Sequence, residues 1–168
     1  MTGEKKASAT KYHRRTLMNV ADRLLVEHGY DGMNMNMLAK EANYSKATVY
    51  VYFESKDSLV GALAAERLDL LQKELALVVK SDLDTDEKFG EVKRVLTEFA
   101  TEDKTYFDFV CNRVDAGKDD LTQEETELIG RVQAVFDTLA PLCDREELLE
   151  KWYAFYGRVK TEKMFEKA

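Results

Sequence analysis

The sequence predicts an all-α fold, and three observations support this prediction. The 168-residue chain contains only one proline and eight glycines, so few positions force a helix to stop. Strong helix formers such as alanine, leucine, glutamate and lysine fill most segments. Apolar residues recur three and four positions apart, which is the spacing of one helix face. With 45% hydrophobic and 34% charged residues, the composition is typical of a globular protein with a buried core.

The sequence lacks the signals of membrane, secreted and metal-binding proteins. Its polar first 16 residues contain no apolar core of a secretory signal, and no apolar run approaches the roughly 20 residues that a membrane span needs. We therefore expect a cytoplasmic protein with no membrane segment. Cys111 and Cys143 are too few for a disulfide framework and lack metal-ligand spacing. Buried or half-buried thiols are expected at both positions, and neither a metal nor a cofactor is predicted.

Charge is distributed unevenly along the chain. The net charge is −7, but residues 1–56 hold nine lysines and arginines against six acidic residues and so carry +3, which leaves −10 on residues 57–168. A basic N-terminal third on an acidic body is typical of a protein that presents one face to a polyanion.

The N-terminal segment is predicted to contain a flexible arm and two helices. Residues 1–10 form the arm, because they are small, polar and lysine-rich and show no apolar periodicity. Helical spacing follows, and His28–Gly29 is a typical helix C-terminus. A second helix is predicted over residues 35–42, with either Asn34 or Met33 at its start.

A break of three residues separates this helix from a short third helix, Lys46 to Tyr52. Asn43 tolerates the left-handed conformation that a tight turn between helices needs, and Ser45 is a good N-cap. Ser55 is the next N-cap. It opens a long fourth helix, which is predicted from about Lys56 to Lys80.

Four further helices are predicted beyond a polar stretch at residues 81–86. Three of them begin with a capping box, in which an aspartate or threonine is followed three residues later by glutamate. Pro141 forces one of them to stop. The four helices are expected at about residues 84–101, 103–115, 122–139 and 144–165.

Residues 35–52 have the features of a helix-turn-helix, which needs a small residue where two helices touch, a tight turn and an exposed face on the second helix. Ala39 is the small residue, and it is assigned to the core together with Leu38, Val49 and Phe53. The outward face of the second helix could enter a DNA major groove. It consists of Lys46, Ala47, Tyr50 and one side of Thr48.

Matches to a known family pattern extend in order over residues 11–60. They comprise His28–Gly29–Tyr30, the run LAKEANYSKATVYVYF at residues 38–53, and SKDSL at residues 55–59. This pattern resembles the TetR family, whose usual run is Gly-Tyr, then Ile-Ala-x-x-Ala-Gly-Val-Ser-x-Gly-Thr-Leu-Tyr-x-Tyr-Phe, then Ser-Lys-Glu-x-Leu. Three residues depart from it, because a capping threonine, the turn glycine and a second-helix glycine are replaced by Met33, Asn43 and Ala47.

The resemblance implies an N-terminal three-helix helix-turn-helix DNA-binding domain followed by a helical effector and dimerisation domain. We divide the chain into an arm (1–10), the DNA-binding domain (11–56), a connecting helix (57–80) and the effector-binding and dimerisation domain (81–168). From position alone, a tyrosine of the third helix could equally be a packing residue and a lysine a solvated charge. Matched residue by residue, the family's DNA contacts fall on Asn36, Lys46, Ala47, Thr48, Tyr50, Tyr52 and Lys56.

The resemblance also implies that the last two helices build the four-helix bundle of a homodimer, and both carry apolar stripes that suit a bundle or a core. The stripe of the first consists of Leu128, Val132, Val135, Phe136 and Leu139. An aromatic-rich set could line a pocket for a small apolar or aromatic effector, although such sets more often form core. Its members are Phe99, Tyr106, Phe107, Phe109, Cys111 and Trp152.

These features predict a TetR-like transcriptional regulator. We expect a repressor that binds a palindromic double-stranded DNA operator as a homodimer and is released by a small-molecule effector, with the fourth helix transmitting the movement. The alternative is a helix-turn-helix scaffold that acts mainly through protein–protein contacts, for which Met33, Met35 and Met37 form an adaptable apolar set. An enzyme is not predicted, because the two histidines, His13 and His28, lie in the DNA-binding unit and form no catalytic constellation.

Overall fold

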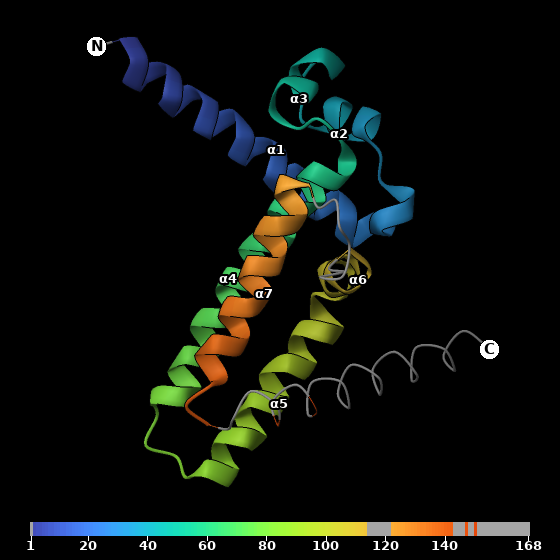
Figure 1. Cartoon of the computed structure of the whole chain (residues 1–168). Coiled ribbons are helices and arrows are strands. Elements are labelled where there is room, and N and C mark those ends of the chain that lie inside the picture. Colours follow the sequence, from blue (N-terminus) through green and yellow to red (C-terminus); the bar gives the residue numbers. More distant parts are fainter. Residues whose placement is uncertain (1, 114–121, 143–146, 148–149, 151–168) are drawn as a thin grey trace, which may run out of the picture.

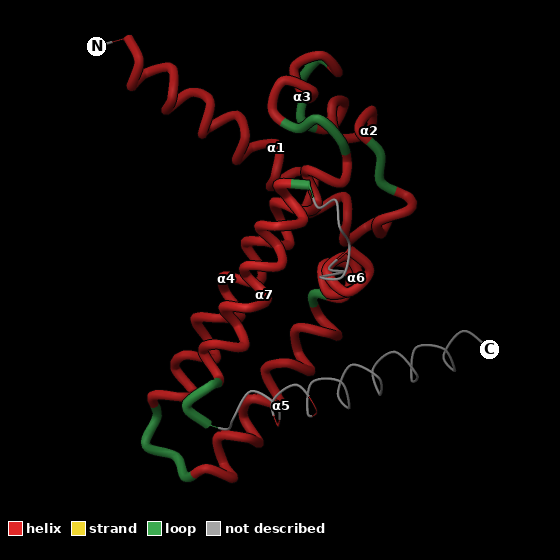
Figure 2. The backbone as a smooth tube through the Cα atoms, viewed as in Figure 1, coloured by secondary structure: helices red, strands yellow, loops and turns green. Residues whose placement is uncertain are grey.

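The computed structural model describes residues 2–113 and 122–142, together with residues 147 and 150. Within these residues the secondary structure consists of helices and turns (Figure 2), which confirms the predicted all-α fold. None of the described helices is long and apolar enough to cross a membrane. The helix predicted over residues 144–165 falls outside the description, apart from positions 147 and 150, and so do Cys143 and Trp152. The helices are α1 (Thr2–Gly32), α2 (Met35–Glu41), α3 (Lys46–Tyr52), α4 (Lys56–Lys80), α5 (Thr85–Glu102), α6 (Lys104–Arg113) and α7 (Gln123–Leu139).

Helix α1 begins earlier than the sequence predicted. Residues 2–10, expected as a flexible arm, belong to one helix that continues to Gly29. There a φ of 67° interrupts it, in a conformation that glycine adopts without strain. The expectation was wrong about secondary structure because it weighed the missing apolar face above the strong helix propensity of alanine, lysine and glutamate. Residues 7–12 are all exposed, so this part of α1 has no packed side.

The predicted helix starts are confirmed by their capping side chains. Asn34, rather than Met33, caps α2: its side-chain oxygen accepts hydrogen bonds from the N–H groups of Asn36 at 3.1 Å and Met37 at 3.0 Å. The other predicted caps each accept a hydrogen bond from the N–H group three residues later. They are Ser45 for α3, Ser55 for α4, Asp84 for α5 and Thr122 for α7.

Helix α4 is the central element of the fold. Figure 1 shows α7 lying along it, and α1, α5 and α6 also contact it. One continuous cluster of buried side chains includes residues of all seven described helices. The predicted core residues of the helix-turn-helix belong to this cluster. They are Leu38, Ala39, Val49 and Phe53. Helices α2 and α3, which we call the reading head, therefore pack on the same core as the rest of the chain.

The apolar stripe of α7 faces the interior of the chain. Leu128, Val135 and Leu139 are buried in the common cluster, while Val132 and Phe136 are half-buried and pack against it. The sequence left open whether this stripe belongs to the core of one chain or to a dimer bundle. In the structure it belongs to the core of the chain.

We predict that Asn34→Ala lowers the free energy of unfolding by about 1 kcal/mol, because two N–H groups at the start of α2 lose their acceptor. Urea unfolding followed by circular dichroism measures the change. Asn36→Ala is the matched control, since Asn36 is exposed on the same helix and its loss should change stability by no more than about 0.5 kcal/mol. Equal effects of the two substitutions would contradict the capping role.

Candidate nucleic-acid interface

The turn between α2 and α3 is closed by a residue in the left-handed conformation. Asn43 has a φ of 57°, as predicted. The N–H of Tyr44 donates to the carbonyl of Ala39 at 2.9 Å, and the N–H of Asn43 donates to that of Lys40 at 3.2 Å. These bonds end α2 and direct the chain at once into α3. Asparagine enters this region more readily than other residues with a side chain, which explains why it can stand where the resembled pattern has glycine.

Helix α3 has one buried side and one exposed side. Val49 and Phe53 are 0% and 1% exposed, which fixes the helix to the core. Lys46 and Ala47 are exposed, and Tyr50 is 42% exposed. The outward face of α3 therefore consists of side chains that contribute little to the buried core.

Thr48 belongs to both sides of α3. It is half-buried, its N–H donates to Ser45 Oγ at 3.0 Å, and its hydroxyl lies 2.7 Å from the same atom. The N-cap residue Ser45 therefore holds one side of Thr48. The sequence predicts that only the other side of this threonine faces outward.

An open groove of about 370 Å³ beside α3 brings four of the predicted contact residues together. Asn36 comes from α2, Lys46 and Tyr50 from α3, and Lys56 from α4. The ammonium of Lys46 lies 5.9 Å from the centroid of the Tyr50 ring. An amide, a phenol and an ammonium are the groups that bind phosphate oxygens and base edges. The remaining lining residues are Asn34, Met35, Glu54 and Ser55.

Lys56 has a structural role that the sequence did not predict. Its ammonium donates to the carbonyls of Tyr30 at 2.9 Å and Met33 at 3.2 Å, and lies 4.1 Å from the Tyr30 ring centroid. The Tyr30 hydroxyl in turn donates to Asp57. This cluster ties the start of α4 to the segment between α1 and α2. A phosphate contact by Lys56 stays a prediction, and it would use the donor capacity that these two carbonyls leave.

Tyr52 lies on the inner end of α3 beside α1. It is half-buried, and its ring centroid lies 6.0 Å from that of His13. Arg14 donates to the Tyr52 carbonyl at 2.9 Å and stands 4.2 Å from the centroid of the Phe53 ring. His13 Nδ1 lies 2.6 Å from the hydroxyl of Tyr44. These contacts brace the reading head against α1, so the packing alternative for Tyr52 has direct support.

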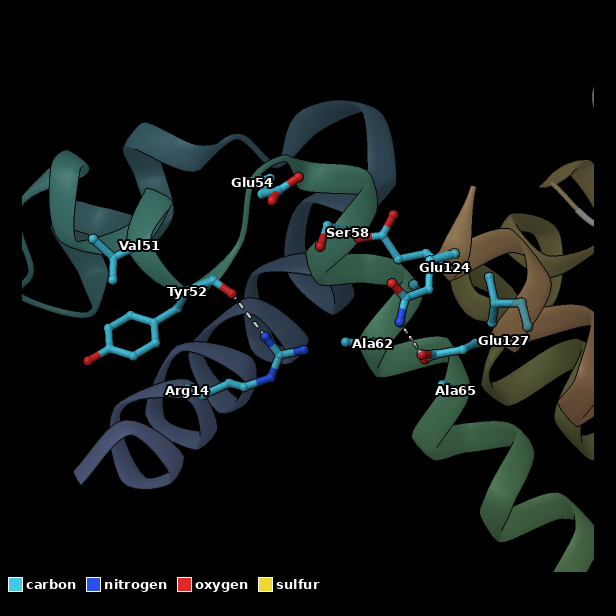
Figure 3. Close-up of a pocket in the computed structure, with 12 residues that line it drawn as sticks. Arg14, Val51, Tyr52, Glu54, Ser58, Ala62, Ala65, Glu124 and Glu127 are labelled. Atoms are coloured by element: carbon cyan, nitrogen blue, oxygen red, sulfur yellow. Dashed lines mark hydrogen bonds between the residues drawn. The ribbon is translucent and has the colours of Figure 1, made fainter. Parts of the chain in front are cut away.

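A cleft of about 470 Å³ lies behind the reading head, between α1, α3, α4 and α7. Figure 3 shows Arg14 and its bond to Tyr52 at one side, with the side chains of Glu124 and Glu127 at the other. The small residues Ala62 and Ala65 of α4 also line it. The cleft therefore adjoins both the reading head and the start of α7.

The predicted effector-pocket residues of α5 and α6 belong to the common core or pack against it. Phe99, Tyr106, Phe107 and Phe109 are each no more than 8% exposed, and Cys111 is half-buried. The rings of Phe99 and Phe107 meet edge to face with centroids 5.9 Å apart. The sixth member, Trp152, lies outside the described residues.

A charged network joins α1, α4 and α6, and sequence analysis missed it. Arg67 on α4 donates to both carboxylate oxygens of Asp22 on α1, at 2.9 and 3.0 Å, and its Nε lies 3.2 Å from Asp103 at the end of α5. The hydroxyl of Tyr106 on α6 donates to Asp22 as well. Burial and the adjacent Asp22 carboxylate raise the pKa of this hydroxyl, so it keeps its proton at neutral pH. One signal was available: Arg67 interrupts the apolar stripe of α4.

The methionines of α2 do not form an open surface. Met33 and Met35 are 0% and 7% exposed, and Met37 is half-buried against the core. These three side chains pack within the chain. The feature on which the scaffold alternative relied is therefore part of the core.

Known proteins resemble the N-terminal part of this chain in sequence. Residues 17–63 match the family of bacterial regulatory proteins, tetR family. Over 78 residues the chain is 32% identical to an uncharacterized HTH-type transcriptional regulator of Haemophilus influenzae, which covers 46% of this chain and 40% of that protein. Over 76 residues it is 34% identical to the HTH-type nicotine-responsive transcriptional repressor HdnoR of Paenarthrobacter nicotinovorans. This match covers 45% of this chain and 39% of that protein. The chain thus matches about two-fifths of the length of each relative.

The likeness in fold extends further than the likeness in sequence. FadR of Bacillus subtilis, solved in complex with stearoyl-CoA, superposes with a TM-score of 0.63 at 15% identity, over 91% of this chain and 88% of that one. At this identity the comparison concerns the fold alone. It relates the helices behind the reading head, as well as the reading head itself, to those of a transcriptional regulator.

We predict that Lys56→Met lowers the free energy of unfolding by about 1–3 kcal/mol, because two backbone carbonyls lose a charged donor while the aliphatic stem is kept. Urea unfolding measures the loss. Lys46→Met is the matched control at an exposed position and should change stability by no more than about 0.5 kcal/mol. If Lys56→Met unfolds at the same urea concentration as the parent, the bonds to Tyr30 and Met33 contribute nothing.

Proposed function

We propose that the protein is a transcriptional regulator, since residues 17–63 match the tetR family of bacterial regulatory proteins. It acts as a repressor, binds a palindromic operator as a homodimer and releases it when a small-molecule effector binds. The observation that carries the proposal is the outward face of α3, whose side chains are exposed while Val49 and Phe53 anchor the helix.

The composition of this face suits a major groove. Lys46 can donate to guanine O6 and N7, and Ala47 offers an apolar contact to a thymine methyl. Tyr50 and Asn36 line the open groove of the protein beside α3, and from there they reach phosphate or base oxygens of the DNA. The +3 charge on residues 1–56 supplies attraction to the DNA backbone, whereas the −10 charge on the remainder repels it. One end of the molecule is therefore oriented toward DNA by its charge.

Dimerisation follows from the geometry of a palindrome, which offers two identical half-sites to two identical reading heads. The buried stripe of α7 packs within the chain, so the proposed dimer bundle relies on the rest of the α7 surface and on residues 144–165. Apart from positions 147 and 150, those residues lie outside the described part of the chain.

Effector control is proposed on two grounds. HdnoR is described as nicotine-responsive, and FadR was solved with stearoyl-CoA, so regulators that resemble this chain in sequence or in fold are associated with small molecules. The aromatic set of α5 and α6 remains the proposed pocket. Because four of its described members are no more than 8% exposed, a ligand enters only if these helices separate.

Movement of α6 has a direct route to the reading head. Tyr106 bonds to Asp22 of α1, and the Phe109 ring lies 5.8 Å from that of Tyr30, the residue whose carbonyl holds Lys56. The sequence predicts that the fourth helix, α4, transmits the effector signal. These contacts support a second path, from α6 to α1, that reaches the recognition helix through its bracing partner.

The first test is DNA binding by a variant of the outward face. DNA selected from a random pool by the parent protein supplies the operator, and a gel-shift titration then compares it with Tyr50→Ala. We predict a loss of affinity of about 10- to 100-fold, the size expected for one well-placed contact. Lys80→Ala, exposed at the far end of α4, should bind as the parent does. A parent protein that selects no sequence, with its dimer intact, would favour the scaffold alternative.

The second test addresses the link between α6 and α1. Asp22→Asn, Tyr106→Phe and the double variant form a double-mutant cycle, and we predict a coupling of about 0.5–3 kcal/mol in unfolding free energy. Operator affinity should fall severalfold in each single variant, because α1 is less firmly held. Additive effects on both stability and affinity would rule out a direct coupling of the two residues.

A further inference from the structure

The first turns of α1 stand apart from the body of the protein. Residues 7–12 are all exposed, Tyr12 by 69%, and the first buried residue after them is Leu17. Figure 1 shows the start of α1 extending away from the other helices, at the end of the molecule that carries α2 and α3. We call residues 2–12 the N-terminal extension.

A helix in this setting needs a partner to be stable. A short helical stretch with exposed side chains, such as residues 7–12, is only marginally helical in water, because nucleation is costly and these side chains gain nothing from burial. The extension therefore gains most from a ligand that binds along its surface.

The charge of the extension indicates what that ligand is. It contains Lys5, Lys6 and Lys11 against Glu4, a net charge of +2 in a chain whose total is −7. The partner it fits is a polyanion, and the operator is the polyanion that lies at this end of the molecule under the proposed function.

The base of the extension is fastened to the reading head. His13, the next residue, contacts the Tyr44 hydroxyl at 2.6 Å, and Arg14 donates to the carbonyl of Tyr52 at 2.9 Å. Tyr44 lies in the turn before α3 and Tyr52 ends α3. The direction in which the extension leaves the body is therefore set by both ends of the recognition helix.

The reach of the extension matches the spacing of DNA strands. Eleven helical residues span about 16 Å, and the major groove is about 12 Å wide. We propose that the N-terminal extension is a second DNA-contacting element, which binds backbone phosphates beside the groove that α3 reads and so lengthens the site covered by each protomer. The inference rests on the proposed function and adds a partner surface to it.

The test compares the salt dependence of operator binding in two variants. One lacks residues 2–10, and the other carries Lys5→Gln, Lys6→Gln and Lys11→Gln, which removes charge while keeping a helix-compatible sequence. Because each phosphate contact contributes about 0.9 to the slope of log affinity against log salt, we expect the triple variant to reduce the slope by about 2–3 for each protomer, and so by about 5 for a bound homodimer. Hydroxyl-radical footprints should be shorter at both ends of the operator for both variants.

Controls separate this inference from the proposed function. Lys73→Gln, Lys80→Gln and Lys93→Gln remove three exposed charges from α4 and α5 and should leave slope and footprint unchanged. Circular dichroism of each variant verifies that the body is folded. If the full chain binds its operator and Tyr50→Ala weakens binding as predicted, but the extension variants keep the parent slope and footprint, the inference is wrong and the proposed function stands. If the full chain selects no DNA, both fail.

Discussion

The rest of the structure depends on the packing of helix α4. Its buried side chains, among them Leu59, Leu63, Leu68 and Leu75, belong to the same apolar cluster as the reading head at one end and α5, α6 and α7 at the other. Because that cluster is continuous, no layer of solvent separates the reading head from α5, α6 and α7. A change in the packing of α5 and α6 therefore alters the surroundings of the reading head without an intervening linker.

Local features of this fold could be predicted from the sequence, and the reason is physical. Caps such as Ser45 and turn residues such as Asn43 act on backbone groups within a few positions, so their effect can be inferred from neighbours in the chain. Asp22 and Arg67 lie 45 positions apart and meet only after α1 and α4 have packed. Nothing in the local sequence specifies such a pair. The N-terminal extension was misassigned because helix propensity and the absence of an apolar face pointed in opposite directions.

Among the predicted contact residues, the structure separates those that the fold needs from those it does not. Lys56 and Tyr52 are tied to α1 and to the segment that follows it, whereas Lys46 and Ala47 are exposed. A family pattern lists both kinds together, since a position is retained equally for packing and for binding. Only the three-dimensional contacts distinguish them, and at Lys56 the two roles would share one ammonium group.

The division of α3 into a buried and an exposed side has an evolutionary consequence. Val49 and Phe53 are constrained by the core, so substitutions there lose stability. Lys46, Ala47 and Tyr50 are exposed and contribute little to the stability of the core, so they can change without unfolding the protein. Under the proposed function, gene duplicates of this chain could therefore diverge in the DNA sequence they recognise while inheriting the same scaffold, and new regulatory circuits could arise by a few surface substitutions on one short helix.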